Sequence, residues 1–347
     1  MPEIKLFSVA DIRNWLIHNQ PVDGLSSAII SPTRAYAILH NPYVTDNDHV
    51  AAAIFDNGEM AAYTSALPEE INGTRYWWFS GLWCNPAYRG RGYGLALIGS
   101  LAEEYGIENC LDRWGAPDVV EIFIFLDHKT TYMPRYVLGN KLNRQTLTGK
   151  VLYALYRVER WLRKLIVSHD KSAYSLSYIT HIDDETYAFI SAHKGRDLFL
   201  HTQQMFNWEL QYSVTLSCSL LEHTIMSCMF ASSELRRSNM YAVQVKDDNK
   251  IVGFYMLKHN DDSLHVLFAY YEQEAMRKVF ASIRDHVQRL GVSQCITDNQ
   301  DIAVYLKQQC GFRKVKKSEV SFSYPETLSI PTDFTMQNGD GDNFMVV

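Results

Sequence analysis

The sequence predicts an α/β protein with mixed sheets, built as two domains of similar topology that one long helix joins. Three observations lead to this fold class. The chain has 347 residues, more than one ordinary hydrophobic core needs. Hairpins followed by helices occur in the first half and recur roughly 190 residues later. Between them lies a segment with the apolar periodicity of an amphipathic helix.

In the first half, turn and cap residues delimit the elements. Ser31-Pro32-Thr33 has the cap and first-turn proline of a helix that runs to about His40. Asn57-Gly58 is the central pair of a two-residue hairpin. The other expected elements are strands at Val50–Ile54, Glu59–Leu67 and Tyr76–Cys84, a helix at Gly92–Tyr105, and a buried strand at the apolar run Val119–Leu126.

The middle of the chain, from about Arg144 to Val167, is predicted to be one amphipathic helix. Such a helix can lie on a membrane, but packing between two domains is commoner and is the interpretation we favour. Its apolar positions are Leu152, Leu155, Val158, Leu162 and Leu165, and Arg157, Arg160, Arg163 and Lys164 lie among its polar positions.

The second half repeats the pattern of the first. Its predicted strands are Tyr241–Val245, Ile251–Leu257, Leu264–Tyr270 and Cys295–Ile296, and its helices Glu274–Leu290 and Asp301–Gln309. The expected organisation is therefore a first domain at 1–142, a linking helix at 143–168, a second domain at 169–326 and a tail at 327–347.

Composition narrows the class of function. A net charge of −6 provides no basic face for nucleic acid. The six cysteines have no metal-site or disulfide spacing, so no metal is expected. The N-terminus has no signal-peptide pattern and the apolar runs are strand-sized, which predicts a cytoplasmic protein without a membrane partner.

One segment predicts a phosphate site. Arg89-Gly90-Arg91-Gly92-Tyr93-Gly94 lies between a strand and a helix, where glycines allow backbone N–H groups to converge on an anion. The two arginines add positive charge and hydrogen-bond donors. The spacing does not fit the dinucleotide fingerprint, because Leu95 occupies the position of its last glycine. A P-loop is also absent at Gly149-Lys150, because Val151 follows where that motif has Ser or Thr.

The segment does match the R/Q-x-x-G-x-G/A signature of the GNAT superfamily, and Gly81–Gly94 resembles that family's strand-four, turn and helix-three unit. The resemblance implies an acyl-CoA-dependent N-acetyltransferase whose loop binds the cofactor pyrophosphate. Asn299 to Gly311-Phe312 resembles the family's last helix. There the phosphate loop is missing and Glu272-Gln273-Glu274 follows the strand, so the second domain is expected to be a degenerate copy.

The resemblance also implies where the chemistry occurs. The pantetheine arm would lie between Tyr76–Cys84 and Val119–Leu126, hydrogen-bonded by backbone groups of Leu82, Trp83 and Cys84, one of which would stabilise the oxyanion. A base or a chain of waters must take a proton from the amine, and an acid must assist the thiolate. Cys84 lies beside the expected thioester, but a small buried hydrophobe is favoured over a covalent nucleophile.

The proton-transfer residues follow less directly from the family pattern. Trp78 occupies the position of the glutamate base that some members use, so Glu69 or Glu70 is a substitute. The family's acid is a tyrosine about four residues before a helix-ending glycine. If Thr131–Gly139 is that helix, this position is Arg135, and Tyr136 or Tyr132 is the candidate.

The leading hypothesis is acetyl transfer from acetyl-CoA to the primary amine of a small acceptor. One alternative is a donor with a longer acyl chain, and another is a non-catalytic acyl-CoA sensor, which the missing strand-four glutamate motivates.

Overall fold

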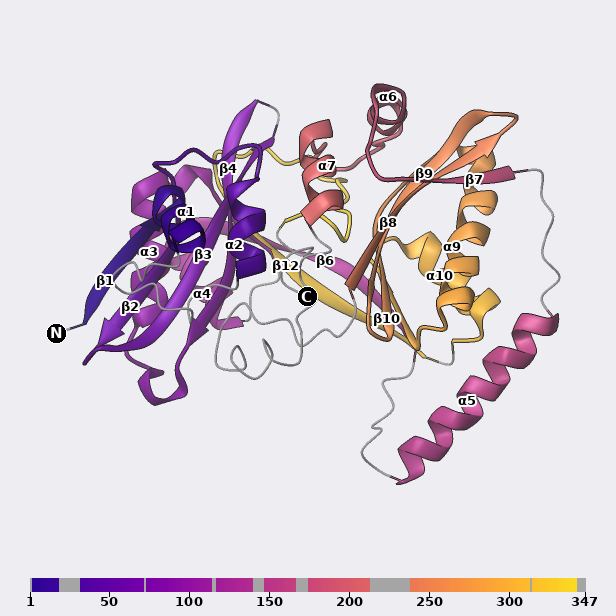
Figure 1. Cartoon of the computed structure of the whole chain (residues 1–347), viewed down its shortest axis with the longest axis horizontal. Helices are drawn as coiled ribbons and strands as arrows, with labels where there is room; N and C mark the ends of the chain where they lie inside the picture. The colour runs from indigo at the N-terminus through magenta and orange to yellow at the C-terminus, as the bar shows by residue number, and fades with distance from the viewer. Residues whose placement is uncertain are drawn as a thin grey trace.

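In the computed structural model the described residues are 2–18, 32–71, 73–113, 117–139, 147–166, 174–212, 238–312 and 314–341. Their strands form one mixed sheet of twelve in the order β1-β2-β3-β4-β5-β12-β6-β11-β10-β9-β8-β7. The first and second halves of the chain form its two ends, and β6 and β12 run between them (Figure 1). The predicted mixed α/β class is confirmed.

In the first half, the predicted elements from the helix at Pro32 to the helix that ends at Tyr105 are present in the predicted order. The Asn57-Gly58 pair has φ values of 54° and 80° and closes the hairpin of β2 and β3, as predicted. The elements are β1 (Glu3–Ser8), α1 (Val9–His18), α2 (Pro32–Leu39), β2 (His49–Asp56), β3 (Glu59–Ile71), β4 (Thr74–Cys84), the short helix η1 (Pro86–Tyr88), α3 (Tyr93–Tyr105), the short helix η2 (Ile107–Asn109), β5 (Cys110–Arg113), α4 (Pro117–Phe125) and β6 (His128–Gly139).

The second half contains the predicted strands and helices with small shifts at their ends. Asp248 and Asn249 have φ values of 46° and 69° and close the hairpin between β8 and β9. The elements are β7 (Tyr174–Ile179), α6 (Asp184–Ala192), α7 (Gln203–Tyr212), β8 (Ser238–Asp247), β9 (Lys250–Asn260), β10 (Ser263–Tyr271), the short helix η4 (Gln273–Ala275), α9 (Met276–Leu290), β11 (Gln294–Thr297), α10 (Gln300–Cys310) and β12 (Val315–Pro325).

The prediction of a strand at Val119–Leu126 is wrong, because these residues lie mostly in helix α4. Val120 and Phe123 are buried three residues apart, while Ile124 and Phe125 are 54% and 73% exposed. A short apolar run fits a buried strand and a helix equally well when periodicity is the only signal. The strand that pairs parallel with β4 is instead β5, at Cys110–Arg113.

The prediction of a helix at Thr131–Gly139 is also wrong, because this segment belongs to β6. β6 pairs with β12 along its whole length, with His128 opposite Pro325 and Leu138 opposite Val315. It pairs with β11 from Tyr136 to Gly139. Pro134 therefore lies beside the point where β11 has ended, an edge position that suits a residue without an N–H donor.

The last strand and the C-terminal segment connect the two halves. β12 lies between β5 and β6, so it completes the sheet of the first half although it follows the second half in sequence. Residues 327–341 are not a peripheral tail, because Met336, Asn338 and Asp340 are at most 5% exposed. The helix α7 also joins the halves, with Trp208 Nε1 donating to the carbonyl oxygen of Ala37 in α2 at 2.9 Å.

The predicted amphipathic helix is α5 (Leu147–Ile166), drawn away from the sheet in Figure 1. The described members of its apolar stripe, Leu152, Leu155, Val158 and Leu162, are 44–60% exposed, so they do not pack between domains as expected. The segments that join α5 to either half, and with them the predicted boundaries at 142/143 and 168/169, lie outside the described residues. None of the helices in the described ranges is long and apolar enough to cross a membrane.

Candidate functional site

The predicted phosphate loop lies between β4 and α3. Asn85 caps the turn η1 by accepting a hydrogen bond from Ala87 N at 3.0 Å, and the chain then reaches Gly90 and Gly92, with φ values of 78° and 77°. A Cβ atom at either glycine would meet no atom within 4 Å, so the positive φ rather than crowding explains these glycines. Gly92 starts α3 without a side-chain cap, so the N-terminal N–H groups of α3 remain available to an anion.

The two arginines of the loop differ in their surroundings. Arg91 Nη1 donates to Asp56 Oδ2 at 2.9 Å, and Tyr93 donates its hydroxyl to the same oxygen at 2.8 Å. The Arg91 guanidinium also lies over the Tyr88 ring, 4.9 Å from its centroid. Arg89 is exposed and forms no ion pair with a residue in the described ranges. Arg91 therefore holds the loop against the end of β2, and Arg89 has the freer guanidinium.

The strand before the loop contains a β-bulge. Ser65 of β3 lies opposite Ser80 of β4, but Tyr63 lies opposite Trp83, so Gly81 and Leu82 together face Thr64. Gly81 has a φ of 60°, which a glycine adopts without strain. Such a bulge turns backbone groups out of the ladder, at the residues predicted to bind the pantetheine arm.

β4 and β5 separate beyond a short stretch of parallel pairing. Their parallel pairing covers Trp77–Phe79 and Cys110–Asp112, and β4 then continues to Cys84 paired with β3 alone. Leu82, Trp83 and Cys84 are half-buried. A Cβ atom on Gly94 would lie 3.1 Å from Leu82 Cδ2 and 3.7 Å from Ile122 Cδ1, so the first turn of α3 packs closely on the bulged strand and on α4. The loop, the bulge and the first turn of α3 thus surround one site.

The surroundings of Cys84 favour a structural role over a nucleophilic one. Burial raises the pKa of its thiol, which the charge of Arg89 lowers in part, and Sγ contacts the carbonyl oxygen of Asn85 at 3.7 Å. A raised thiol pKa disfavours a nucleophilic thiolate. His128, the nearest histidine after α4, is buried between the carbonyl oxygens of Cys110 and Leu126, at 2.9 and 3.1 Å.

Glu69 is neither exposed nor close to the bulge. Its side chain is 1% exposed, accepts a hydrogen bond from Trp78 Nε1 at 2.7 Å, and pairs with His201 Nδ1. Glu69 lies five residues from Thr64 along β3, roughly 16 Å at the rise of a strand. It is therefore well placed to hold Trp78 and poorly placed for direct proton transfer at the bulge.

The candidate tyrosines lie on β6 rather than on a helix. Tyr132 is 57% exposed. Tyr136 is buried and donates its hydroxyl to Gln300 Oε1 at 3.1 Å. The helix that follows β5 is α4, which ends before Asp127, where φ is 58°. Four residues before Asp127 is Phe123, so the position that the family resemblance gives to a tyrosine acid has no proton to donate.

Sequence reasoning missed a buried ionic network that links the halves. His201 is 0% exposed and contacts Glu69 on one side and Asp340 Oδ1 on the other, at 2.9 Å for the second contact. Burial alone would lower the pKa of His201, but the charge of Glu69 and the hydrogen bonds to Asp340 and Glu69 raise it well above its usual value.

Arg113 extends this network towards the second half. Its Nη1 donates to the carbonyl oxygens of Gln337 and Asp340 at 2.5 and 2.9 Å, and its Nη2 donates to Asp298 Oδ2 at 2.7 Å. Arg113 lies more than 100 residues from each of these partners in the chain, and no motif in the sequence brings them together.

Comparisons with known proteins agree with this geometry. The acetyltransferase (GNAT) family matches residues 10–119, which include the loop and the bulged strand. No curated protein matches the chain in sequence. A putative acetyltransferase from Pyrococcus horikoshii has 10% identity and a TM-score of 0.51, over 97% of this chain and 93% of its own. An N-myristoyltransferase from Saccharomyces cerevisiae with bound myristoyl-CoA has 11% identity and a TM-score of 0.52, over 100% and 85% of the two chains.

A tandem GNAT protein from the clavulanic acid biosynthesis pathway is also similar, with 13% identity over 95% of this chain and 100% of its own, and a TM-score of 0.49. At such identities a structural likeness shows the fold alone. The family match covers the segment in which the loop, the bulge and α3 were found. Residues 10–119 thus match the acetyltransferase (GNAT) family, and the chain shares its fold with a putative acetyltransferase.

Proposed function

We propose that this protein transfers an acetyl group from acetyl-CoA to the primary amine of a small acceptor, by direct attack within a ternary complex. The observation that carries the proposal is the phosphate loop: two glycines with positive φ and open space above them, followed by a helix whose N-terminus has no side-chain cap. Backbone N–H groups in this arrangement favour a pyrophosphate. The pantetheine arm would then bind between the diverging ends of β4 and β5.

The reaction proposed here forms one bond and breaks one bond. The amine nitrogen attacks the thioester carbonyl, the C–S bond breaks, and the amide and the CoA thiol leave. A backbone N–H at the Gly81-Leu82 bulge would donate to the carbonyl oxygen as negative charge develops on it. The attacking amine must first lose a proton, and the thiolate must finally gain one.

The geometry supports water as the carrier of these protons. Glu69 is enclosed by Trp78 and His201, and Tyr136 lies against Gln300 of the second half. The role of Glu69 as a general base and the roles of Tyr132 and Tyr136 as acids stay predictions. A chain of water molecules between these diverging strands is the route that requires no additional side chain.

A donor with a longer acyl chain is the second candidate. The N-myristoyltransferase from Saccharomyces cerevisiae has the same fold over the full length of this chain and was solved with bound myristoyl-CoA. In this protein, Ile124 and Phe125 leave apolar surface exposed at the end of α4, next to the Ile122 that packs near the bulge. A longer chain would have apolar side chains to contact there.

A thiol-release assay separates these candidates. Full-length protein is given acetyl-CoA, octanoyl-CoA or myristoyl-CoA, each with a panel of primary amines. The proposal expects the highest kcat/KM with acetyl-CoA and an amide product by mass spectrometry. Turnover that rises with chain length would favour the second candidate. Tight acyl-CoA binding without turnover for any amine would indicate a sensor and contradict both.

A further inference from the structure

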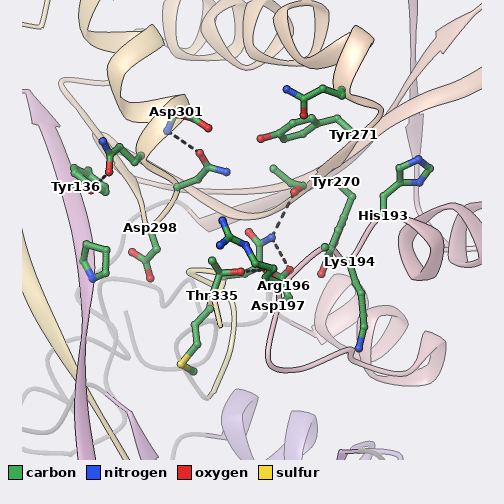
Figure 2. A pocket seen from close by; sticks show the side chains of 18 residues that line it. Tyr136, His193, Lys194, Arg196, Asp197, Tyr270, Tyr271, Asp298, Asp301 and Thr335 are labelled. Atoms are coloured by element: carbon green, nitrogen blue, oxygen red, sulfur yellow. Dashed lines mark hydrogen bonds between the residues drawn. The ribbon is translucent and has the colours of Figure 1, made fainter. Parts of the chain in front are cut away.

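The second half contains a cavity of about 580 Å³ that the proposed acetyl transfer does not use. Its walls are the end of β10, the turn from β11 into α10, the loop at His193–Asp197, the C-terminal segment at Thr335–Gln337, and Pro134 and Tyr136 of β6. Figure 2 shows these side chains around a common space, with Tyr136 and Asp298 at the left and Tyr271 at the upper right.

This cavity lies beyond the parallel pairing of β10 and β11, as the predicted pantetheine site in the first half lies beyond that of β4 and β5. β10 pairs parallel with β11 over three residues, Ser263–His265, as β4 does with β5. In both halves the two strands separate beyond this pairing. In the second half Ala269–Tyr271 and Asp298–Asp301 then line the opening. The second half therefore has the same strand arrangement, and what differs is the chemistry of the residues beyond it.

The difference in chemistry is one of charge. Where the first half has its glycine loop, the second has η4, and Glu272 at its start pairs with Lys250 Nζ at 2.6 Å. The walls carry three carboxylates, Asp197, Asp298 and Asp301. A phosphate is disfavoured at such a site, whereas a cation is favoured.

Asp197 and Asp301 form no ion pair with a residue in the described ranges, and Asp301 is exposed whereas Asp197 is partly buried. Asp298 is held by Arg113 at 2.7 Å and by Arg135 at 3.5 Å. Asp197 accepts hydrogen bonds from Thr335 Oγ1 at 2.7 Å and from Gln337 Nε2 at 2.8 Å, and it forms no ion pair with any residue in the described ranges. Two neutral donors fix the direction of this carboxylate without adding a positive charge.

A second polar group of the wall also lacks a partner. Tyr270 is 2% exposed, and its hydroxyl has no hydrogen-bond partner among the described residues. Burial, followed by the charge of Asp197, raises the pKa of this hydroxyl well above its usual value. A buried hydroxyl without a partner costs stability unless a ligand supplies one.

The positive groups near the cavity do not cancel the charge of Asp197. Arg196 points its guanidinium towards Asp333, with 3.5 Å between Nη1 and Oδ2, and both side chains are about two-thirds exposed. Lys194 also lines the cavity but makes no ion pair with the described residues.

We propose that this cavity binds an organic primary amine in its ammonium form. The carboxylate of Asp197 and the hydroxyl oxygen of Tyr270 accept its N–H donors, and the rings of Tyr136 and Tyr271 offer aromatic faces to its carbon skeleton. The site rests on the geometry of this cavity and not on acetyl transfer. Its ligand is either the acceptor of the first half's reaction or a separate amine.

This site implies a pH dependence of amine binding. Burial, and then the negative charge of Asp340, raise the pKa of Asp197 to about 7. The charged groups that act on Asp197 are Asp340 and His201, and Lys194, Arg196, Asp298 and Asp301 line the same cavity. Because the protonated carboxyl has no charge to offer an ammonium, affinity is expected to fall as the pH is lowered from 8 to 6.

Titration calorimetry on the full-length protein without any acyl-CoA tests the proposal. The probe is phenethylamine, and its neutral isostere 2-phenylethanol is the ligand control. The amine is expected to bind at least about tenfold more tightly than the alcohol at pH 8. Asp197→Asn should weaken amine binding by about tenfold, and Tyr270→Phe by several-fold without loss of fold, since no hydrogen bond to a described residue is lost.

The matched control is Asp248→Asn, which makes the same charge change in an exposed turn whose φ of 46° asparagine tolerates, and which should bind the amine as the wild type does. Equal affinity for amine and alcohol, wild-type affinity in Asp197→Asn, or no binding of phenethylamine at about 10 mM would overturn the proposal. Adding acetyl-CoA then shows whether the bound amine is acetylated, and both results are compatible with the site. Because binding is measured without a donor, failure of acetyl transfer leaves this test intact.

Discussion

Replacing His201 with leucine tests whether the buried ionic network holds the halves together. His201 lies between Glu69 of β3 and Asp340 of the C-terminal segment and is 0% exposed. Removing it leaves two carboxylates in the protein interior without the cation between them. Breaking a buried ion pair by removal of one partner costs about 3–5 kcal/mol.

The contacts that remain place the expected loss near the lower limit of that range. Trp78 still donates to Glu69 at 2.7 Å, and Arg113 Nη1 still lies 3.8 Å from Asp340 Oδ2. The free energy of unfolding should therefore fall by about 3 kcal/mol at pH 7. The double variant with Glu69→Gln should recover about 1–2 kcal/mol of this, because a neutral amide replaces one of the uncompensated charges.

Urea unfolding followed by tryptophan fluorescence measures both variants. The control is His49→Leu, since His49 forms a 2.8 Å pair with Glu104 on the surface, where such a pair contributes at most about 1 kcal/mol. The pH dependence has a definite sign. Because the folded-state pKa of His201 is raised, its stabilisation is complete below its unfolded pKa of about 6.5 and is lost as the pH rises through the folded value. If His201→Leu lowers the free energy of unfolding by no more than His49→Leu does at every pH, the reasoning is refuted.

Two further predictions test the corrected elements. Tyr136→Phe should lower kcat by less than about tenfold in the thiol-release assay, because Tyr136 lies on β6 against Gln300; a loss of about a hundredfold or more would restore its role as the general acid. Gly339→Ala should lower the free energy of unfolding by about 1–3 kcal/mol in urea, since its Cβ would lie 2.3 Å from the Phe268 ring; an unchanged midpoint would mean that the C-terminal segment does not pack there.

The elements that sequence analysis predicted correctly are those with local signals. The Asn57-Gly58 hairpin and the helix from Tyr93 to Tyr105, ended by Gly106 with a φ of 81°, each depend on residues adjacent in the chain. The phosphate loop was predictable for the same reason. The incorrect strand prediction at Val119–Leu126 rested on the apolar run alone. The better signal is Pro117-Asp118, a pair typical of the first turn of a helix.

The rest of the fold and site depends on contacts between distant segments. Nothing near Val315–Pro325 indicates that this strand pairs with β5 and β6 of the first half. His201 meets Glu69 and Asp340 across separations of 132 and 139 residues, and neither partner belongs to a motif. One sequence without related sequences carries no signal for such contacts, so the network and the second-half cavity could be found only in three dimensions.

The central claim is that the Arg89–Gly94 loop binds the pyrophosphate of an acyl-CoA. Titration calorimetry of acetyl-CoA with the wild type, Arg89→Glu, Arg91→Glu and Arg277→Glu tests it most directly. Arg277 is exposed in the first turn of α9, the second-half counterpart of α3, and provides the matched charge reversal. We predict micromolar binding to the wild type and to Arg277→Glu, and affinity at least about a hundredfold weaker in both loop variants with the fold retained by circular dichroism. Wild-type affinity in Arg89→Glu and Arg91→Glu, or no binding of acetyl-CoA to the wild type, would contradict the account.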